Sequence, residues 1–179
     1  TEQITHMDIP PSLLRIFTPN DMPASLETII IGGEACAKET IHQWADVVRL
    51  VNVYGPTEAF VCTSLNICDK NWDMPIIGNA FDHVIYDIVD GELWIGGNCL
   101  ADGYQNRPDL TDEKFITTDK GRFYRTGDHV RRLDNGDIAF FGRIDRQFKL
   151  RGQLIAPEEI ENTLKKCPTI EKAAILKTN

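Results

Sequence analysis

The sequence predicts an α/β fold in three successive parts: the end of a parallel-sheet α/β subdomain, a β-rich subdomain shaped as a distorted barrel, and the start of a small α+β domain. Three observations lead to this prediction. A strand, helix and strand pattern fills residues 28–53, short strands dominate from about residue 75, and a charged run over 143–147 precedes a helix opened by proline. We place the three parts at 1–75, 76–144 and 145–179.

The first part contains two predicted strands joined by a helix. The β-branched run 28–31 stops at Gly32-Gly33, apolar residues recur at helical spacing from Ile41 to Val48, and a second apolar run covers 50–53. This order favours a parallel pair with a right-handed crossover. Both strands then end at the same edge of a sheet, where α/β proteins hold their ligands.

The second part is predicted to be antiparallel. Its short strands are expected at 84–89, 92–95, 123–125, 130–133 and 138–141. Asn135-Gly136 separates the last two strands and indicates a hairpin, because both turn residues tolerate positive φ. A helix is predicted over 110–115, with Asp109 or Thr111 as its cap.

The third part begins with the charged run and continues with a strand at 148–150. Pro157 suits the first turn of a helix, and Ile160 and Leu164 give that helix one apolar face. A further strand is predicted at 173–176. These elements indicate the beginning of a new unit after residue 144.

Composition limits the possible function classes. The 179 residues are 42% hydrophobic and 26% charged, which is typical of a globular protein. A net charge of −8 argues against general nucleic-acid binding, which requires a basic surface. We find no apolar run of about 20 residues and no signal-peptide pattern, and we interpret the five cysteines as free thiols. A cytoplasmic location is expected.

Residues 51–58 carry the most chemistry. Gly55-Pro56 marks a turn after a strand, so the neighbouring side chains are exposed at the end of the sheet. Tyr54 can stack on a base, Thr57 can bond a phosphate, and Glu58 can hold Mg²⁺. On this octapeptide alone, a strand-ending turn with a capping Thr and a solvated Glu is an equally good interpretation.

Four blocks occur in order: IGGEA at 31–35; NVYGPTE at 52–58; GELWIGG at 91–97 with Gly103-Tyr104 and Arg107-Pro108 after it; and YRTGD at 124–128 with GRIDRQFKLRG at 142–152. Together they resemble the adenylation domains of nonribosomal peptide synthetases, within the adenylate-forming enzymes. The resemblance covers nearly the whole chain. It implies an internal fragment, because the family's phosphate-binding loop and terminal lysine have no counterpart here. The fragment alone is therefore expected to be inactive.

The resemblance implies that a carboxylate attacks the α-phosphate of ATP, and that the acyl-AMP passes to the phosphopantetheine thiol of a peptidyl carrier protein. Thr57 would then contact the α-phosphate, Glu58 would hold Mg²⁺, and Tyr54 would stack on adenine. Asp128 would bind both ribose hydroxyls, and Arg143 would contact ribose or phosphate. The remaining residues expected at the nucleotide are Gly33, Glu34, Asn52 and Gly55.

A substrate pocket, a hinge and a thiolation face are implied in the same way. The pocket positions are small or apolar and predict a hydrophobic amino, keto or hydroxy acid: Ile30, Gly32, Val53, Val61 and Cys62. Core packing is an alternative for Ile30 and Val61. Asp145 matches the hinge of the small domain, and Lys149 and Gly152 are expected on the face that meets the thiol.

Two other functions stay open. Leu154-Ile155-Ala156-Pro157 is closer to the pattern of acyl-CoA ligases, so coenzyme A or an acyl carrier protein is an alternative acceptor. A non-catalytic fragment that binds nucleotide or a complementing chain is the third possibility. The exact acid and the oligomeric state are left open.

Overall fold

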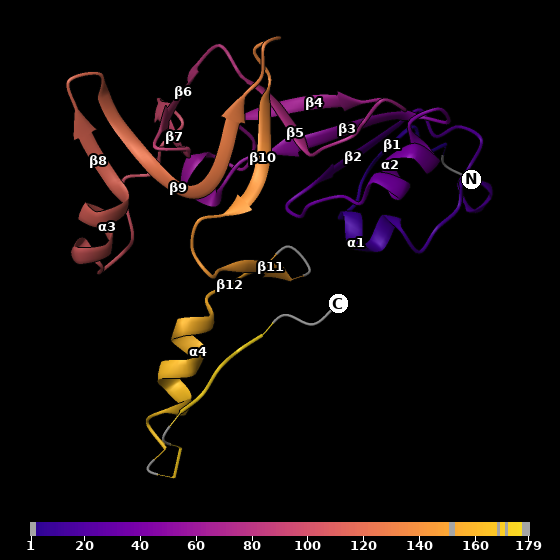
Figure 1. Ribbon diagram of the computed structural model, residues 1–179. Coiled ribbons are helices and arrows are strands. Elements are labelled where there is room, and N and C mark those ends of the chain that lie inside the picture. Colours follow the sequence, from indigo (N-terminus) through magenta and orange to yellow (C-terminus); the bar gives the residue numbers. More distant parts are fainter. Residues whose placement is uncertain (1–2, 151–152, 168, 171, 177–179) are drawn as a thin grey trace.

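The computed structural model describes residues 3–150, 153–167, 169–170 and 172–176. Within this part of the chain, ten strands form one sheet in the order β1-β2-β3-β4-β5-β10-β9-β7-β6, and β8 pairs with β9 (Figure 1). The strands are β1 His6–Asp8, β2 Thr28–Gly32, β3 Arg49–Tyr54, β4 Ser64–Cys68, β5 Ile76–Ala80, β6 Val84–Val89, β7 Glu92–Gly97, β8 Phe115–Thr118, β9 Gly121–Arg132 and β10 Ile138–Arg143.

Helices are short. They are α1 Pro11–Leu14, α2 Lys38–Trp44, α3 Pro108–Lys114 and α4 Pro157–Leu164, with single 3-10 turns at Pro19–Asp21 and Thr57–Ala59. None of the described helices is long and apolar enough to cross a membrane. A separate hairpin, β11 Phe148–Leu150 and β12 Gln153–Ile155, precedes α4.

Strands β1, β2 and β3 are parallel, as the strand, helix and strand pattern predicted. Ile29, Ile31 and Leu50 are fully buried and share one core with Leu14 of α1 and Trp44 of α2. The alternating burial of β2 places Ile30 and Gly32 on the opposite face of the sheet from this core. Apolar packing against α1 and α2 therefore fixes the carboxyl ends of the parallel strands.

The later strands are antiparallel, again as predicted. Strand β5 pairs with both β4 and β10, so the two parts share a continuous sheet. Strand β6 comes back against β5, and Tyr86 of β6 shares a hydrogen bond of 2.6 Å with Thr63. The curved, partly closed sheet encloses a second core with Leu93, Ile95 and Ile138.

Strand β9 corrects the prediction of separate strands at 123–125 and 130–133, because one strand runs from Gly121 to Arg132. Trp94 faces Arg125 and Glu92 faces His129, so three residues of β9, 126–128, face the single residue Leu93. This is a β-bulge, which bends the strand and redirects its side chains. The bulge interrupts the strand pattern, and this explains why the sequence indicated two strands.

The predicted cap of α3 is wrong. The helix begins at Pro108 after Arg107, and neither Asp109 nor Thr111 acts as N-cap. Asp109 instead pairs with the Arg107 guanidinium at 3.0 Å, while the Thr111 hydroxyl donates to the Arg107 carbonyl at 2.9 Å. Phe115, predicted as the last helical residue, begins β8, a strand that was not predicted.

The predicted β9–β10 hairpin is confirmed, but only Gly136 takes a positive φ, of 92°, while Asn135 does not. The Asn135 side chain contributes differently, since its Oδ1 accepts from the Asp137 amide at 3.1 Å. Four other short strands, β1, β4, β5 and β12, were not predicted. Polar residues such as Ser64 and Asn66 weaken the apolar pattern of β4.

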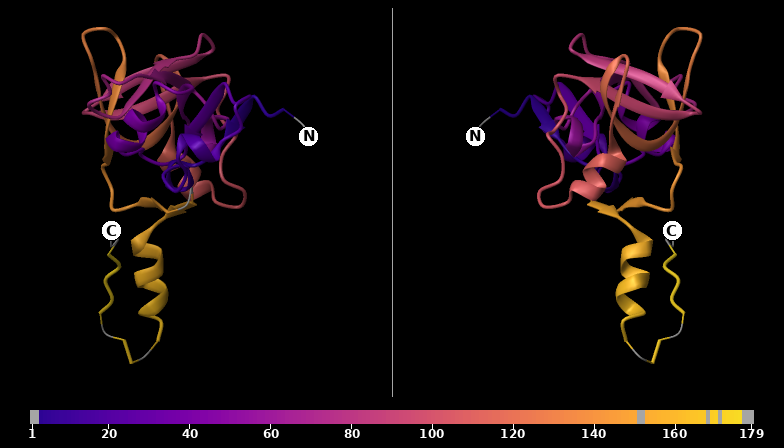
Figure 2. Two further views of the ribbon diagram at one scale, coloured as in Figure 1. Left: turned by 90° about the vertical axis from the view of Figure 1, so that its right-hand side faces the viewer. Right: turned by 90° about the vertical axis from the view of Figure 1, so that its left-hand side faces the viewer.

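The end of the described chain projects from the body of the molecule, as both views in Figure 2 show for α4. The strand at 148–150 and the helix opened by Pro157 are confirmed. Ile160 and Leu164 are each 39% exposed, so the described residues cover the predicted apolar face only in part. The predicted strand at 173–176 is wrong: this segment pairs with no strand in the part of the chain that the structure describes, although the Ile175 amide donates to Glu161 Oε1 at 2.8 Å.

Candidate functional site

Two turns lie side by side at the carboxyl ends of β2 and β3. Gly32 pairs with Val53, and a Cβ on Gly32 would lie 2.6 Å from Val53 Cγ2. Gly33 follows with a φ of 77°, a conformation that glycine adopts without strain. The glycine pair therefore brings Gly33 and Glu34 close to the end of β3, where Tyr54 lies.

The turn after Tyr54 is tight and strained. A Cβ on Gly55 would lie 2.4 Å from the Val61 carbonyl oxygen, so only glycine fits there. Phe60 and Val61 have φ values of 63° and 65°, and a β-branched residue in this conformation is rare. Both side chains are 76% exposed. The strain presents two apolar side chains beside Thr57 and Glu58.

Tyr54 and Asp128 meet although 74 residues separate them. The Tyr54 hydroxyl donates to Asp128 Oδ2, and the Arg143 guanidinium donates to Asp128 Oδ1 at 3.0 Å. The Asp128 side chain is 11% exposed. Burial raises the pKa of Asp128, whereas the Tyr54 hydroxyl, the Arg143 guanidinium and the more remote Lys149 ammonium lower it. Both oxygens of this carboxylate are thus oriented by the protein.

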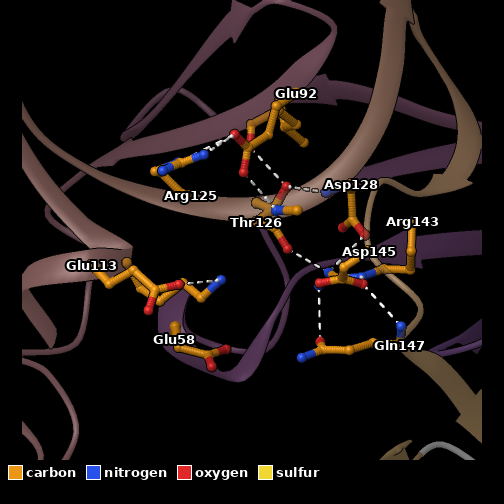
Figure 3. Close-up of polar contacts among 12 residues, drawn as sticks. Glu58, Glu92, Glu113, Arg125, Thr126, Asp128, Arg143, Asp145 and Gln147 are labelled. Carbon is orange, nitrogen blue, oxygen red and sulfur yellow. Dashed lines mark hydrogen bonds and ion pairs between the residues drawn. The ribbon is translucent and has the colours of Figure 1, made fainter. Parts of the chain in front are cut away.

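Arg143 joins Asp128 to the predicted hinge (Figure 3). Its Nη2 donates to Asp145 Oδ2 at 2.6 Å and to Gln147 Oε1 at 2.9 Å. Gly127 has a φ of 70°, which favours glycine beside Asp128, and a Cβ there would also lie 2.6 Å from Arg143 Nη2. One guanidinium therefore connects the carboxylate of β9 with the segment that leads to β11.

Glu58 is half-buried and held from the loop after β7. Tyr104 donates its hydroxyl to Glu58 Oε1 at 2.7 Å, and the Ala101 amide donates to the Glu58 carbonyl at 2.8 Å. Burial and the hydrogen bond to Glu58 raise the pKa of Tyr104 to about 12, so this hydroxyl remains a donor at neutral pH. Glu58 is therefore presented as an oriented carboxylate.

The donor set at Glu58 fits a Mg²⁺ ion. Mg²⁺ is commonly held by one or two carboxylates together with substrate phosphates and water. Among the described residues, no group of three or more His, Cys, Asp or Glu side chains could hold a metal by itself. An open pocket of about 420 Å³ adjoins this site, and it is lined by Thr57, Phe60, His83, Asn98, Cys99, Leu100 and Ala101.

The other predicted residues are distributed as follows. Ile30, Gly32 and Val53 lie together on the face of the sheet opposite α2, whereas Val61 is exposed and Cys62 donates to the Ser64 carbonyl. Asn52 is buried, and its amide donates to the Ile76 carbonyl at 3.0 Å. Lys149 lies on β11, and Gly152 falls outside the described residues.

Several polar residues of the site were not singled out from the sequence. Glu92 accepts a hydrogen bond from the Gly127 amide at 2.9 Å, and the Arg125 guanidinium donates to the same carboxylate at 3.1 Å. Tyr104 was quoted only within a motif. A polar residue at a buried position of a strand was the available signal, and Glu92 at the start of β7 is one.

Comparisons with known proteins place this geometry in context. A family model described as "AMP-binding enzyme" matches residues 1–105. A linear gramicidin synthase of Brevibacillus parabrevis is 40% identical over 190 residues, covering 98% of this chain and 2% of the synthase. Bacitracin synthase 3 of Bacillus licheniformis is 38% identical over 187 residues, covering 97% of this chain and 3% of that synthase.

Solved structures agree. The chain matches an NRPS protein containing adenylation and PCP domains with a TM-score of 0.87 and 26% identity, over 97% of this chain and 40% of that one. It matches the Vibrio cholerae adenylation domain AlmE, in complex with glycyl-adenosine-5'-phosphate, with a TM-score of 0.85 and 27% identity. That match covers 96% of this chain and 37% of AlmE. The chain thus spans a small part of the two synthases and about two fifths of the solved relatives.

Proposed function

The chain belongs to the AMP-binding enzyme family, and from this premise we propose that it is part of an amino-acid adenylation domain for nonribosomal peptide synthesis. The parent protein would join a carboxylic acid to the AMP moiety of ATP and release pyrophosphate. One observation carries the proposal: Tyr54, Asp128 and Arg143 are hydrogen-bonded together at the carboxyl end of parallel strands.

Asp128 is proposed to bind the ribose. A carboxylate has about four acceptor positions, so its oxygens retain acceptor capacity beside the bonds from Tyr54 and Arg143. Those two donors fix the direction of the carboxylate before the nucleotide arrives. Because the site is already oriented, less ordering is required on binding. Gly33, Glu34, Asn52 and Gly55 remain proposed nucleotide contacts, and the ring of Tyr54 is the proposed stacking surface.

Glu58 and Thr57 are proposed to act at the phosphates. The Tyr104 hydroxyl holds the Glu58 carboxylate by a hydrogen bond, and Thr57 lines the adjoining pocket. Mg²⁺, when bound, would neutralise charge on the phosphates as the acid attacks. Glu58 would hold it through its carboxylate, with further ligands from ATP and water.

The acid and the acceptor are finer proposals. The apolar face formed by Ile30, Gly32 and Val53 favours a hydrophobic side chain, because a charged group there would be unpaired. Val61 and Cys62 are proposed to complete this pocket. The proposed acceptor is a phosphopantetheine thiol on a peptidyl carrier protein, with Lys149 and Gly152 on the face that meets it and Asp145 as hinge.

The division at 76 and 145, the cytoplasmic location and the inactivity of this chain alone are also proposals. In the complete protein, amino-acid-dependent exchange of pyrophosphate into ATP measures the first half-reaction, and hydrophobic acids should be preferred. A preference for Asp, Glu, Lys or Arg would contradict the pocket. Transfer to coenzyme A in place of a carrier protein would favour an acyl-CoA ligase instead.

Nucleotide binding is the direct test for this chain. We expect that titration of AMP into the nitrogen-15-labelled chain shifts the amide NMR signals around Tyr54 and Asp128. Asp128→Asn should weaken AMP on the order of 10-fold, because a hydrogen bond to a charged group is lost. Asp119→Asn, at an exposed turn, is the matched control. The proposal fails if AMP shifts no signals, or if both variants weaken AMP equally.

A further inference from the structure

Glu92 is a buried carboxylate outside the proposed nucleotide contacts, and it is saturated with donors. Its Oε2 accepts from Trp94 Nε1 at 3.1 Å and from Arg125 Nη2 and Nε at 3.1 and 3.2 Å. Its Oε1 accepts from the Gly127 amide at 2.9 Å. The Glu92 side chain is only 11% exposed. A carboxylate buried at this depth requires such partners, and breaking them is costly.

The contact to Gly127 falls within the β9 bulge. Gly127 has a φ of 70°. Its amide donates to the Glu92 side chain and not to a backbone carbonyl of strand β7. The rest of the bulge is held by side chains too, because the Thr126 hydroxyl donates to the Leu93 carbonyl at 2.7 Å and accepts from the Asp128 amide at 3.0 Å. Strand β7 therefore holds Thr126 and Gly127 directly, and Thr126 in turn holds the Asp128 amide.

The bulge determines where Asp128 points. In a regular strand, the side chain of residue 128 would follow the alternation of its neighbours. The two extra residues instead let the Asp128 carboxylate accept hydrogen bonds from both Tyr54 and Arg143, and Figure 3 shows the Arg143 side of this contact. Loss of the Glu92 contact releases the amide of the residue immediately before Asp128.

We propose that Glu92 is a positioning residue for the nucleotide: by holding Gly127, it aims Asp128 at the ribose. This inference rests on the proposed function, in which Asp128 binds the ribose hydroxyls. It assigns Glu92 no contact with ligand. The effect of Glu92 on binding must therefore pass through Asp128.

The test compares two ligands on the full 179-residue chain. AMP offers ribose hydroxyls to Asp128, whereas 2′,3′-dideoxy-AMP does not. Glu92→Gln should weaken AMP on the order of 10-fold, while the dideoxy analogue changes less than about 3-fold. Glu92→Gln added to Asp128→Asn should cause no further loss, because both act through one interaction. Glu27→Gln, at an exposed position before β2, is the control.

A second variant distinguishes a loss of positioning from a general loss of folding. Thr126→Val keeps the shape of the side chain but removes the hydroxyl that holds the Asp128 amide, and it should show the same selectivity for AMP over the analogue. Equal weakening of both ligands by Glu92→Gln and Thr126→Val would overturn the positioning role, since that result indicates general destabilisation. Unchanged AMP affinity in Glu92→Gln would also overturn it. If Asp128→Asn has no effect on AMP, the proposed function itself fails.

Discussion

The parallel and antiparallel parts of the sheet hold their functional residues by different forces. Around β2 and β3, fully buried apolar residues pack against α1 and α2, and the glycine turns follow from the strand ends. Around β7, β9 and β10, charged side chains fix the geometry through hydrogen bonds. Glu92 accepts from the Gly127 amide in the bulge, and Arg143 donates to Asp128. Apolar packing tolerates small shifts, whereas hydrogen bonds to a carboxylate require a particular direction. The parallel part therefore contributes mainly to the stability of the fold, and the antiparallel part contributes mainly to the orientation of Asp128.

The largest effect should separate stability from binding. Trp44 is fully buried in the core of the parallel part, so Trp44→Ala should cost about 3–5 kcal/mol of unfolding free energy. The AMP affinity of the folded fraction should stay within about 2-fold, because Trp44 is fully buried and is not one of the proposed nucleotide contacts. Denaturant unfolding and AMP titration measure the two quantities.

The matched control is Trp44→Phe. Trp44 Nε1 has no hydrogen-bond partner among the described residues, so this change loses volume but no polar contact, and it should destabilise much less than alanine. If Trp44→Ala abolished AMP binding while the chain remained folded, the proposed division of labour would be wrong.

The reverse separation is expected at Glu58. In the complete protein, Glu58→Gln should lower the adenylation rate on the order of 10²-fold or more, because a metal ligand loses its charge. Mg²⁺-independent AMP binding should change little, and so should stability, since Gln retains an oxygen for Tyr104. Pyrophosphate exchange at varied Mg²⁺ concentration provides the measurement. An unchanged kcat with normal Mg²⁺ dependence would refute the assignment.

Asp145, the proposed hinge, tests whether the hydrogen-bonded residues around Arg143 also control rotation of the small domain. Proline fixes φ near −65°, so Asp145→Pro should retain adenylation within about a few-fold and strongly reduce thioester formation in the complete protein. Asp145→Ala loses the same contacts to Arg143 but keeps φ free, and it should spare both half-reactions. Equal losses in the two half-reactions for Asp145→Pro would leave the hinge without support.

The smallest effect concerns the Arg146–Glu161 pair near the end of the chain. The hydrogen bond from Arg146, with that from the Ile175 amide, lowers the pKa of Glu161 from 4.5 to about 2. A carboxyl with a lowered folded-state pKa contributes stability above its ordinary pKa and loses it as the pH falls toward the folded value. The protection factor of the Ile175 amide, which is its intrinsic hydrogen-exchange rate divided by the observed rate, should therefore fall as the pH is lowered from 4.5 to about 2. In Glu161→Gln this pH dependence should disappear, and its persistence there would contradict the assignment.

The elements of the parallel part were easier to predict from the sequence than the polar contacts of the antiparallel part, and the reason is physical. Burial alternates along a strand and recurs along a helix, so 28–53 could be interpreted from one stretch of sequence. Glu92, Gly127 and Tyr104 act on partners 35 and 46 residues away, and no local pattern encodes such pairs. Asp128 was proposed only through resemblance to a family, whereas residues 51–58 alone already offered Glu58 as a candidate Mg²⁺ ligand. The β9 bulge was missed because two extra residues break the strand period at the functional position.

The separation of 74 positions between Tyr54 and Asp128 also determines the order in which the two residues emerge during synthesis of the polypeptide. At about 5–20 residues per second, a ribosome takes roughly 4–15 s to add a stretch of this length. During that interval β2, α2 and β3 are complete and can pair, but Tyr54 has no carboxylate to meet. The core of the parallel part can therefore form well before the nucleotide site does, so translation itself orders the assembly of scaffold and site.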